Sequence, residues 1–215
     1  MKYPKFSPEQ ELKLSELRGK LKALLSEKRY SHTLYVEKTA YELASVILPD
    51  RIYDICVAAI LHDATKEFSA KEHIALIESE NTSLTDEDKA TEGILHSFSA
   101  PVFCRKEFSE YVNKDILSAI KNHTVGSPSM SNFDKIVFIS DFIEESRKYK
   151  ACIELRRWLL SEISSEKKYE DKIYSLNKAC LLAILATEES LKAKDATVNS
   201  RMLLTKDSLV RQLEI

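Results

Sequence analysis

Glycine and proline are scarce in this chain, and their scarcity limits what the chain can fold into. Only three glycines and five prolines occur in 215 residues, and these residue types commonly mark the ends of helices and strands. Between them, apolar residues recur at spacings of three and four, without the sustained alternation of a half-buried strand. The sequence therefore predicts an all-α fold. A chain of this length has room for one compact domain with a substantial core.

Capping signals and proline indicate where helices begin and end. Ser7, followed by proline and by Gln10, has the pattern of a capping box with proline at the first helical position. Ser69 and Glu72 repeat that pattern, and Asp50 is expected to cap the helix that leads to residue 62. The helices expected after the first one lie over about 30–48, 52–62, 85–95, 114–123, 132–149, 153–164 and 169–194.

Three further expectations concern local structure. The tripeptide at 81–83 is expected to be a loop, and the polar tract 161–172 is either a loop or a solvated helix face. We assign neither a function. The first helix is expected to bury a leucine stripe: Leu14, Leu17, Leu21, Leu24 and Leu25.

Charge and cysteine content narrow the possible functions. The 32 basic and 34 acidic residues give a formal net charge of −2, which provides no overall field for nucleic acid or an anionic membrane. The sequence has neither the long apolar run of a membrane span nor the pattern of a signal peptide. We therefore expect a cytoplasmic protein with no nucleic-acid or membrane partner, and a homodimer stays open. The four widely spaced cysteines are expected to be reduced core residues: Cys56, Cys104, Cys152 and Cys180.

Histidines and aspartates fall on the apolar faces of the expected helices. His32, His62, His123 and Asp141 each lie three, four or seven residues from apolar residues of the same helix. Asp63 follows His62 directly, so this pair can present a nitrogen and a carboxylate to one centre. Burying an unpaired carboxylate is costly, and inward histidines also need partners. A shared metal cluster would satisfy both requirements.

The simpler explanation of an inward histidine is a hydrogen-bonded core residue, and a helical scaffold with such histidines is one alternative. The complete set favours a metal site, because four of the five histidines occur in it together with two aspartates. His73 is the exception, and we expect it on the surface. Imidazole and carboxylate ligands suit iron, manganese, cobalt or zinc, and the lack of cysteine nearby argues against a structural zinc site.

The order of these residues, His32, then His62-Asp63, then Asp141, resembles the HD-domain superfamily of metal-dependent phosphohydrolases. The additional His96 and His123 resemble its two-metal branch. Five strings between about 29 and 147 resemble the bacterial YqeK-type symmetrical dinucleoside tetraphosphatases: RYSHTLYV, ILHDATKE, LHSFSAPVF, AIKNHTVGSPSMS and FDKIVFISDFIEESR. The resemblance implies a compact HD-domain helical bundle over 1–215, with an N-terminal helix in 1–28, a core over about 29–150 and C-terminal helices over about 151–215.

The resemblance also implies a reaction, namely hydrolysis of diadenosine tetraphosphate to two ADP molecules by a metal-bridged hydroxide. The expected cofactors are two divalent metal ions, iron in the first place, with manganese, cobalt and zinc as alternatives. Asp63, as the bridging ligand, and Lys66 are the expected catalytic residues. The implied metal ligands are His32, His62, Asp63, His96, His123 and Asp141. The implied substrate contacts are Arg29, Lys66, His96, His123, Arg147 and Asn199.

Alternatives to these roles stay open. Without the resemblance, a solvated surface lysine is the favoured interpretation of Lys66, and the alternative for Arg29 and Arg147 is a surface ion-pair partner. Segment 198–202 departs from the family pattern, which leaves the nucleobase preference open. The alternative functions are an HD-domain phosphohydrolase of another nucleotide and a nucleotide-binding regulatory module with little activity.

Overall fold

The computed structural model describes residues 5–80, 84–164 and 166–214, and helices are the only regular elements within these ranges. The expected all-α fold is confirmed. Two short 3-10 helices, Pro49–Arg51 and Glu92–Ile94, accompany the α-helices. The α-helices are α1 (Pro8–Lys22), α2 (Glu27–Ile47), α3 (Ile52–Leu61), α4 (Ala70–Glu78), α5 (Asp86–Ala90), α6 (Leu95–Glu107), α7 (Lys114–Asn122), α8 (Asn132–Ile143), α9 (Lys150–Glu162), α10 (Tyr169–Lys192) and α11 (Ser200–Leu213).

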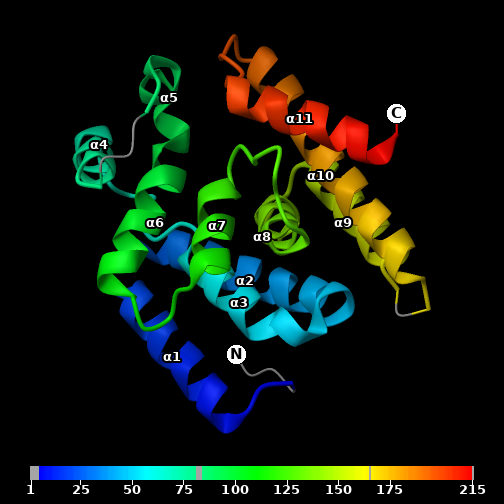
Figure 1. Cartoon of the computed structure of the whole chain (residues 1–215), viewed down its shortest axis with the longest axis horizontal. Helices are drawn as coiled ribbons and strands as arrows, with labels where there is room; N and C mark the ends of the chain where they lie inside the picture. The colour runs from blue at the N-terminus through cyan, green and yellow to red at the C-terminus, as the bar shows by residue number, and fades with distance from the viewer. Residues whose placement is uncertain (1–4, 81–83, 165, 215) are drawn as a thin grey trace.

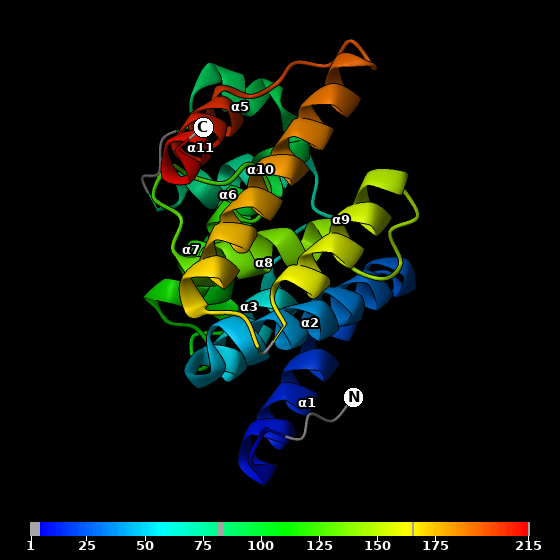
Figure 2. The same cartoon turned by 90° about the vertical axis from the view of Figure 1, so that its right-hand side faces the viewer.

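The helices are arranged around a centre formed by α2, α3, α7 and α8, which pack against one another. Figure 1 shows α4, α5 and α6 on one side of this centre and α9, α10 and α11 on the other, while α1 lies along the edge. In the perpendicular view, α9 and α10 lie side by side, and both pack against α8 (Figure 2). After its first turn, helix α3 is apolar on every side, and every residue from Ile55 to Leu61 is buried, as expected for a central helix.

The capping boxes at Ser7 and Ser69 are both present, as the sequence predicts. The expected cap at Asp50 is wrong, because Asp50 lies within the 3-10 helix and α3 begins after Arg51 without a side-chain cap. The leucine stripe of α1 is buried except for Leu24, whose side chain is 43% exposed. Helix α1 ends at Lys22, so the helical spacing that defined the stripe does not continue to Leu24.

Helix α6 is the main element that the sequence patterns missed. The expected helix over 85–95 is divided into α5 and a 3-10 helix, and α6 begins where the expected helix ends. Pro101 lies inside α6 and is buried, although proline removes a backbone hydrogen bond from a helix and usually marks its end. Helix α11 was not among the helices expected from the sequence patterns, although the resemblance implies C-terminal helices over about 151–215. Helix α8 ends at Ile143, six residues before its expected end.

The remaining local expectations have mixed outcomes. Tract 161–172 contains the end of α9, a connection and the start of α10, so both interpretations apply to parts of it. The expected loop at 81–83 lies outside the described residues. All four cysteines are free and buried, as expected.

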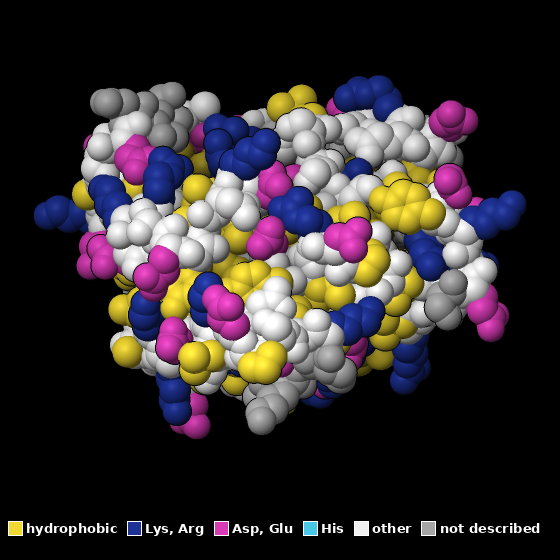
Figure 3. Space-filling view, turned by 60° about the horizontal axis from the view of Figure 1, so that its bottom comes forward, with side chains coloured by type: hydrophobic (Ala, Val, Ile, Leu, Met, Phe, Trp, Pro, Cys, Tyr) yellow, Lys and Arg dark blue, Asp and Glu magenta, His cyan; other side chains and the backbone are white. Residues whose placement is uncertain are grey.

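Acidic and basic side chains are interspersed over the face shown in Figure 3, without a region of one sign of charge. No described helix combines the length and the apolar character that a membrane span requires.

Candidate metal centre

The four central helices and α6 bring the six expected ligands together. His62 and Asp63 follow the last residue of α3, and His123 follows the last residue of α7. His96 lies in the first turn of α6 and Asp141 in the last turn of α8. His32 is supplied by the first half of α2. Residues that are 109 positions apart in the sequence therefore meet at one point of the fold.

Asp63 lies at the centre of this group, and its two carboxylate oxygens face different histidines. The Oδ2 atom lies 3.4 Å from Nε2 of His62 and 3.8 Å from Nε2 of His32. The Oδ1 atom lies 3.3 Å from Nε2 of His96 and 3.6 Å from Nε2 of His123. One carboxylate thus joins two pairs of imidazoles.

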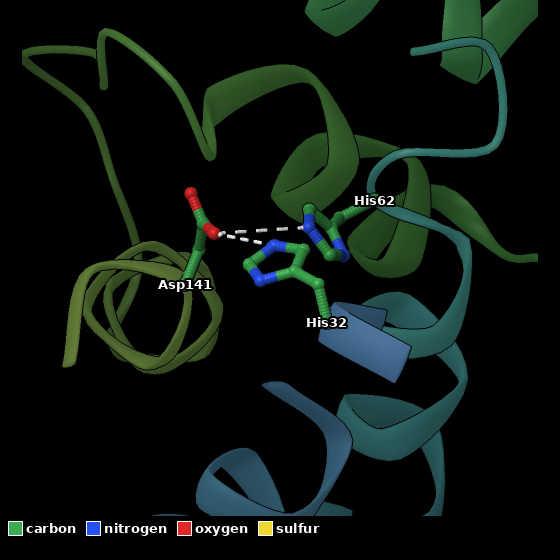
Figure 4. A group of neighbouring side chains, drawn as sticks. All are labelled: His32, His62 and Asp141. Atoms are coloured by element: carbon green, nitrogen blue, oxygen red, sulfur yellow. Dashed lines mark ion pairs between the residues drawn. The ribbon is translucent and has the colours of Figure 1, made fainter. Parts of the chain in front are cut away.

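Asp141 completes the first of these two halves. Its Oδ1 atom lies 2.9 Å from Nε2 of His32 and 3.9 Å from Nε2 of His62, and both rings point toward the carboxylate (Figure 4). The donor atoms of His32, His62 and Asp141 lie within 4.8 Å of one another, and so do those of His62, Asp63 and His123. Both groups have the compact donor arrangement that a divalent metal requires.

In three of the histidines, the ring nitrogen that faces away from the cluster, Nδ1, has a partner within the protein. Nδ1 of His62 donates to the carbonyl of Ala59 at 2.7 Å, and Nδ1 of His123 donates to the carbonyl of Ile120 at 2.6 Å. Nδ1 of His32 lies 3.2 Å from Oε1 of Glu144. Such partners fix the tautomer in which the other nitrogen, Nε2, offers its lone pair. Within the described part of the chain, the buried Nε2 atom of His62 has no hydrogen-bond partner, and Nε2 of His32 faces carboxylate oxygens, the nearest being Oδ1 of Asp141 at 2.9 Å. The residues therefore fit a bound metal.

The ionisation of the group favours cations. Burial alone would raise the pKa of Asp63, but His62, His123 and His96 outweigh burial and hold this pKa well below its usual range. The pKa of Asp141 is lowered in the same way, by His32 and Arg147 against the effect of burial. Burial lowers the pKa of His96, so its ring is neutral, as a metal ligand must be.

His32 behaves differently from the other rings. Burial lowers its pKa, but hydrogen bonding to Asp141 and Glu144 prevails and raises it to about 9. In the metal-free protein His32 therefore carries a proton at neutral pH, which a bound cation has to displace.

Three basic side chains border the cluster. Arg29 contacts Oδ2 of Asp63 and Arg147 contacts Oδ1 of Asp141, each at 2.8 Å. Nζ of Lys66 lies 3.1 Å from both ring nitrogens of His96, and burial lowers the pKa of this amine. Because α3 ends before His62, Lys66 reaches the site from a turn whose backbone bonds to Asp63, and not from a continued helix.

Asn199 is the expected substrate contact that is engaged elsewhere. Its buried side chain caps α11 by accepting from the backbone of Arg201, and it donates to Oδ1 of Asp88 at 3.5 Å. These bonds link α11 to α5. A role for Asn199 in substrate binding stays a prediction.

The expectation that His73 lies on the surface is wrong. Its side chain is buried, and Nδ1 lies 2.7 Å from Oγ of Ser99. Helix α4 packs against α6, an element that was not anticipated, so the face carrying His73 had no expected partner. Ser99 in turn contacts Thr65, which donates to the backbone carbonyl of His96.

Two side chains near the cluster were missed. Glu144, fully buried, holds His32 and accepts from the backbone and hydroxyl of Ser146. Oγ1 of Thr124 lies 3.1 Å from Nε2 of His96 and 3.0 Å from Nε2 of His123. The sequence signal that could have identified them was their closeness to expected ligands, because Glu144 lies three residues after Asp141 and Thr124 directly follows His123.

A family model described as HD domain matches residues 29–146, more than half of the chain. The chain belongs to the HD-domain family. His62 and Asp63 lie within the matched range of this HD-domain protein. The expected metal-dependent phosphohydrolase class is thereby confirmed, and the histidine and aspartate cluster described above has the donors for divalent metals.

The HD-domain protein is similar to two proteins named bis(5'-nucleosyl)-tetraphosphatase, symmetrical. The one from Bacillus subtilis is 31% identical over 193 residues, which cover 88% of this chain and 94% of the relative. The one from Halalkalibacterium halodurans is 34% identical over 136 residues, which cover 63% of this chain and 71% of the relative. A crystal structure from Clostridium acetobutylicum, described as a predicted HD superfamily hydrolase involved in NAD metabolism, superposes with a TM-score of 0.80 at 29% identity, over 92% of this chain and 97% of that one.

Proposed function

We propose that this HD-domain protein cleaves diadenosine tetraphosphate symmetrically into two ADP molecules at a dinuclear metal site. The observation that carries the proposal is the position of Asp63, whose two oxygens face two separate histidine pairs. A carboxylate placed in this way can be shared by two cations. The names of the two bacterial relatives support the choice of substrate.

The donors divide into two sets around the shared carboxylate of Asp63. His32, His62 and Asp141 would complete the set for one metal, and His96 and His123 the set for the other. When bound, a pair of divalent ions lowers the pKa of a coordinated water and offsets negative charge at the reacting phosphoryl group. Iron is our first expectation. The same donors accept manganese, cobalt or zinc.

The basic residues at the rim would bind and orient the substrate. Arg29 and Arg147 present guanidinium groups next to the two aspartates, and a guanidinium matches a pair of phosphate oxygens. The amine of Lys66 reaches the His96 half of the cluster. There it would donate to phosphate oxygens as their charge changes during cleavage. These three residues would fix the polyphosphate across the two halves.

A second candidate is hydrolysis of another nucleotide at the same centre. It is favoured by the position of Asn199, whose amide caps α11 and contacts Asp88 in place of facing the cluster. The phosphate-binding residues do not depend on the base, so this candidate keeps the same chemistry.

A cytoplasmic location and a single domain over 1–215 also stay predictions.

Product analysis tests the proposal. Purified protein is incubated with diadenosine tetraphosphate under reducing conditions, with iron(II), manganese, cobalt or zinc supplied separately. ADP as the sole nucleotide product is the expected result. ATP together with AMP would contradict symmetrical cleavage, and no turnover with any metal would direct the search to other nucleotides or to the regulatory alternative.

A further inference from the structure

A cleft of about 820 Å³ opens beside the first half of the cluster. Its inner wall includes His32 and Glu144, and its sides include Arg29 and Arg147, the two arginines that contact the site aspartates. A volume of this size is within the range that holds a nucleotide. The cleft therefore leads from the surface to the proposed reaction centre.

The charge inside the cleft favours an anion. Four basic residues line it, against the two carboxylates of Glu67 and Glu144. Both carboxylates are engaged within the protein, Glu67 by the backbone and hydroxyl of Ser26 and Glu144 by His32 and Ser146. Lys28 and Lys148, by contrast, form no ion pair with any described residue. Their charges are available to a phosphate chain.

Tyr149 lies at the outer part of this cleft. Its side chain is 73% exposed, the highest value among the large hydrophobic residues that the structure describes. Exposing an aromatic ring to this extent forgoes the free energy that its burial would provide. A base stacked on the ring would recover part of that free energy, because every nucleobase has a flat π-face.

Hydrogen bonds from α9 hold the segment that carries Tyr149 in place. The guanidinium of Arg156, on α9, donates to the backbone carbonyls of Ile143 and Glu144 and to that of Arg147. These bonds fix the turn between α8 and α9. The turn positions Arg147, Lys148 and Tyr149 along one side of the cleft. The backbone that carries these side chains is therefore held in place before a ligand binds.

We propose that this cleft is the seat of one nucleoside diphosphate half of the substrate, with Tyr149 stacking on its base and Lys28 and Lys148 binding its phosphates. The inference rests on the proposed function for the identity of the substrate. It adds that one end of the dinucleotide is recognised on the His32 side of the cluster. It also assigns base recognition on that side to an aromatic ring, which is tolerant of different bases.

The test measures ADP binding to the metal-loaded protein by titration calorimetry, with pyrophosphate as a probe that lacks the base. Tyr149→Ala is expected to weaken ADP binding about tenfold, since base stacking on an aromatic ring is commonly worth this much, and to leave pyrophosphate binding within twofold. Tyr149→Phe should retain ADP binding. Tyr174→Ala removes a half-exposed tyrosine of α10 that does not line the cleft, and this control should leave both affinities unchanged.

Lys148→Met should weaken ADP and pyrophosphate binding by similar factors, because both probes carry phosphates. The inference is overturned if Tyr149→Ala leaves ADP affinity within twofold, or if it weakens pyrophosphate binding as much as ADP binding. These results are independent of turnover. Absence of diadenosine tetraphosphate hydrolysis by the wild-type protein would contradict the proposed function alone, while the calorimetry would still decide whether the cleft binds a nucleoside diphosphate.

Discussion

Two clusters of buried charge in this molecule solve the same problem in opposite ways. Between α1 and α2, Arg18 and Glu37 form a pair with side-chain exposures of 8% and 0%. The guanidinium bonds to both carboxylate oxygens, one of them at 2.8 Å. In the cluster around Asp63, by contrast, Nε2 of His62 has no hydrogen-bond partner among the described residues, and four imidazoles face the one carboxylate at 3.3–3.8 Å.

The difference separates a structural cluster from a ligand-binding one. A buried charge requires a partner. In the α1–α2 pair the partner is another side chain, so nothing external is needed. In the cluster around Asp63, several imidazoles share one carboxylate, and an external cation would be a partner for all of them. Substitutions in the two clusters should therefore affect different quantities, stability in one and metal content in the other.

The largest effect is expected for Asp63→Asn, which preserves size but removes the shared negative charge. Turnover should fall by at least about a thousandfold, because metal ions contribute several kcal/mol to transition-state stabilisation. Metal content, measured by plasma mass spectrometry, should fall below two ions per chain. Asp54→Asn, at the other end of α3, is the matched control. An Asp63→Asn protein with full metal content and activity would contradict the bridging role.

Glu37→Gln should act on stability alone. It removes the charge of Glu37 from the buried guanidinium of Arg18, and breaking a buried pair in this way commonly lowers the free energy of unfolding by about 3–5 kcal/mol. Urea unfolding of the metal-free protein measures this change, while metal content should stay the same. Replacing both residues, Arg18→Met with Glu37→Leu, should restore most of the stability. A loss of metal in either variant would erase the distinction between the clusters.

Lys66→Met should lower kcat by about a hundredfold, as is typical when one charge-stabilising donor is removed. The metal ligands stay intact, so metal content should not change. Steady-state kinetics on metal-loaded protein, with the metal content measured on the same sample, checks both statements. Unchanged kinetics would show that Lys66 does not bind phosphate during cleavage.

Glu144→Gln addresses the support behind His32. The variant keeps a hydrogen-bond acceptor for Nδ1 but loses the charge, and changes at such supporting positions commonly lower metal affinity by about 10–100-fold. Competition with a metal chelator measures the affinity. Glu145→Gln, on the adjacent exposed residue that pairs with Lys38, should have no effect. Equal affinities for all three proteins would show that Glu144 has no part in holding the metal.

The smallest effect concerns the pair of Asp88 and Arg201, a second closed cluster. Hydrogen bonds from Arg201 outweigh burial and lower the pKa of Asp88, so the carboxylate stabilises the fold above the ordinary aspartate pKa of about 3.9. This contribution is lost as pH falls through the lower folded pKa. Asp88→Asn should cost about 1 kcal/mol at pH 7, because Arg201 is partly exposed, and the difference should shrink in acid. A difference independent of pH would contradict the pair's role.

Local signals in the sequence identified much of the fold. The serine caps of α1 and α4 depend only on residues three positions apart, and both formed as predicted. Helix α6 depends on its surroundings, since packing against α4 and α7 stabilises a helix that contains Pro101. No local pattern reveals that compensation. The error at His73 has the same origin, because its burial requires α6 as a partner.

For the site, the inward positions of His32, His62, His123 and Asp141 followed from helical spacing, and the structure brings them together. The sharing of Asp63 between two histidine pairs does not follow from spacing, because it depends on where α6 begins and α7 ends relative to the end of α3. Glu144 was missed for a related reason. Its contact with His32 joins residues of α2 and the turn after α8, and only the packing of these elements places them together.

The central claim is that Asp63 joins two metal ions, and anomalous diffraction from crystals of the metal-loaded protein tests it most directly. The account predicts two anomalous peaks per chain, roughly 3.5–4 Å apart as in other two-metal sites. One peak should lie on the side of His32, His62 and Asp141, and the other on the side of His96 and His123, with Asp63 between them. A single fully occupied peak, or metal bound away from Asp63, would contradict it.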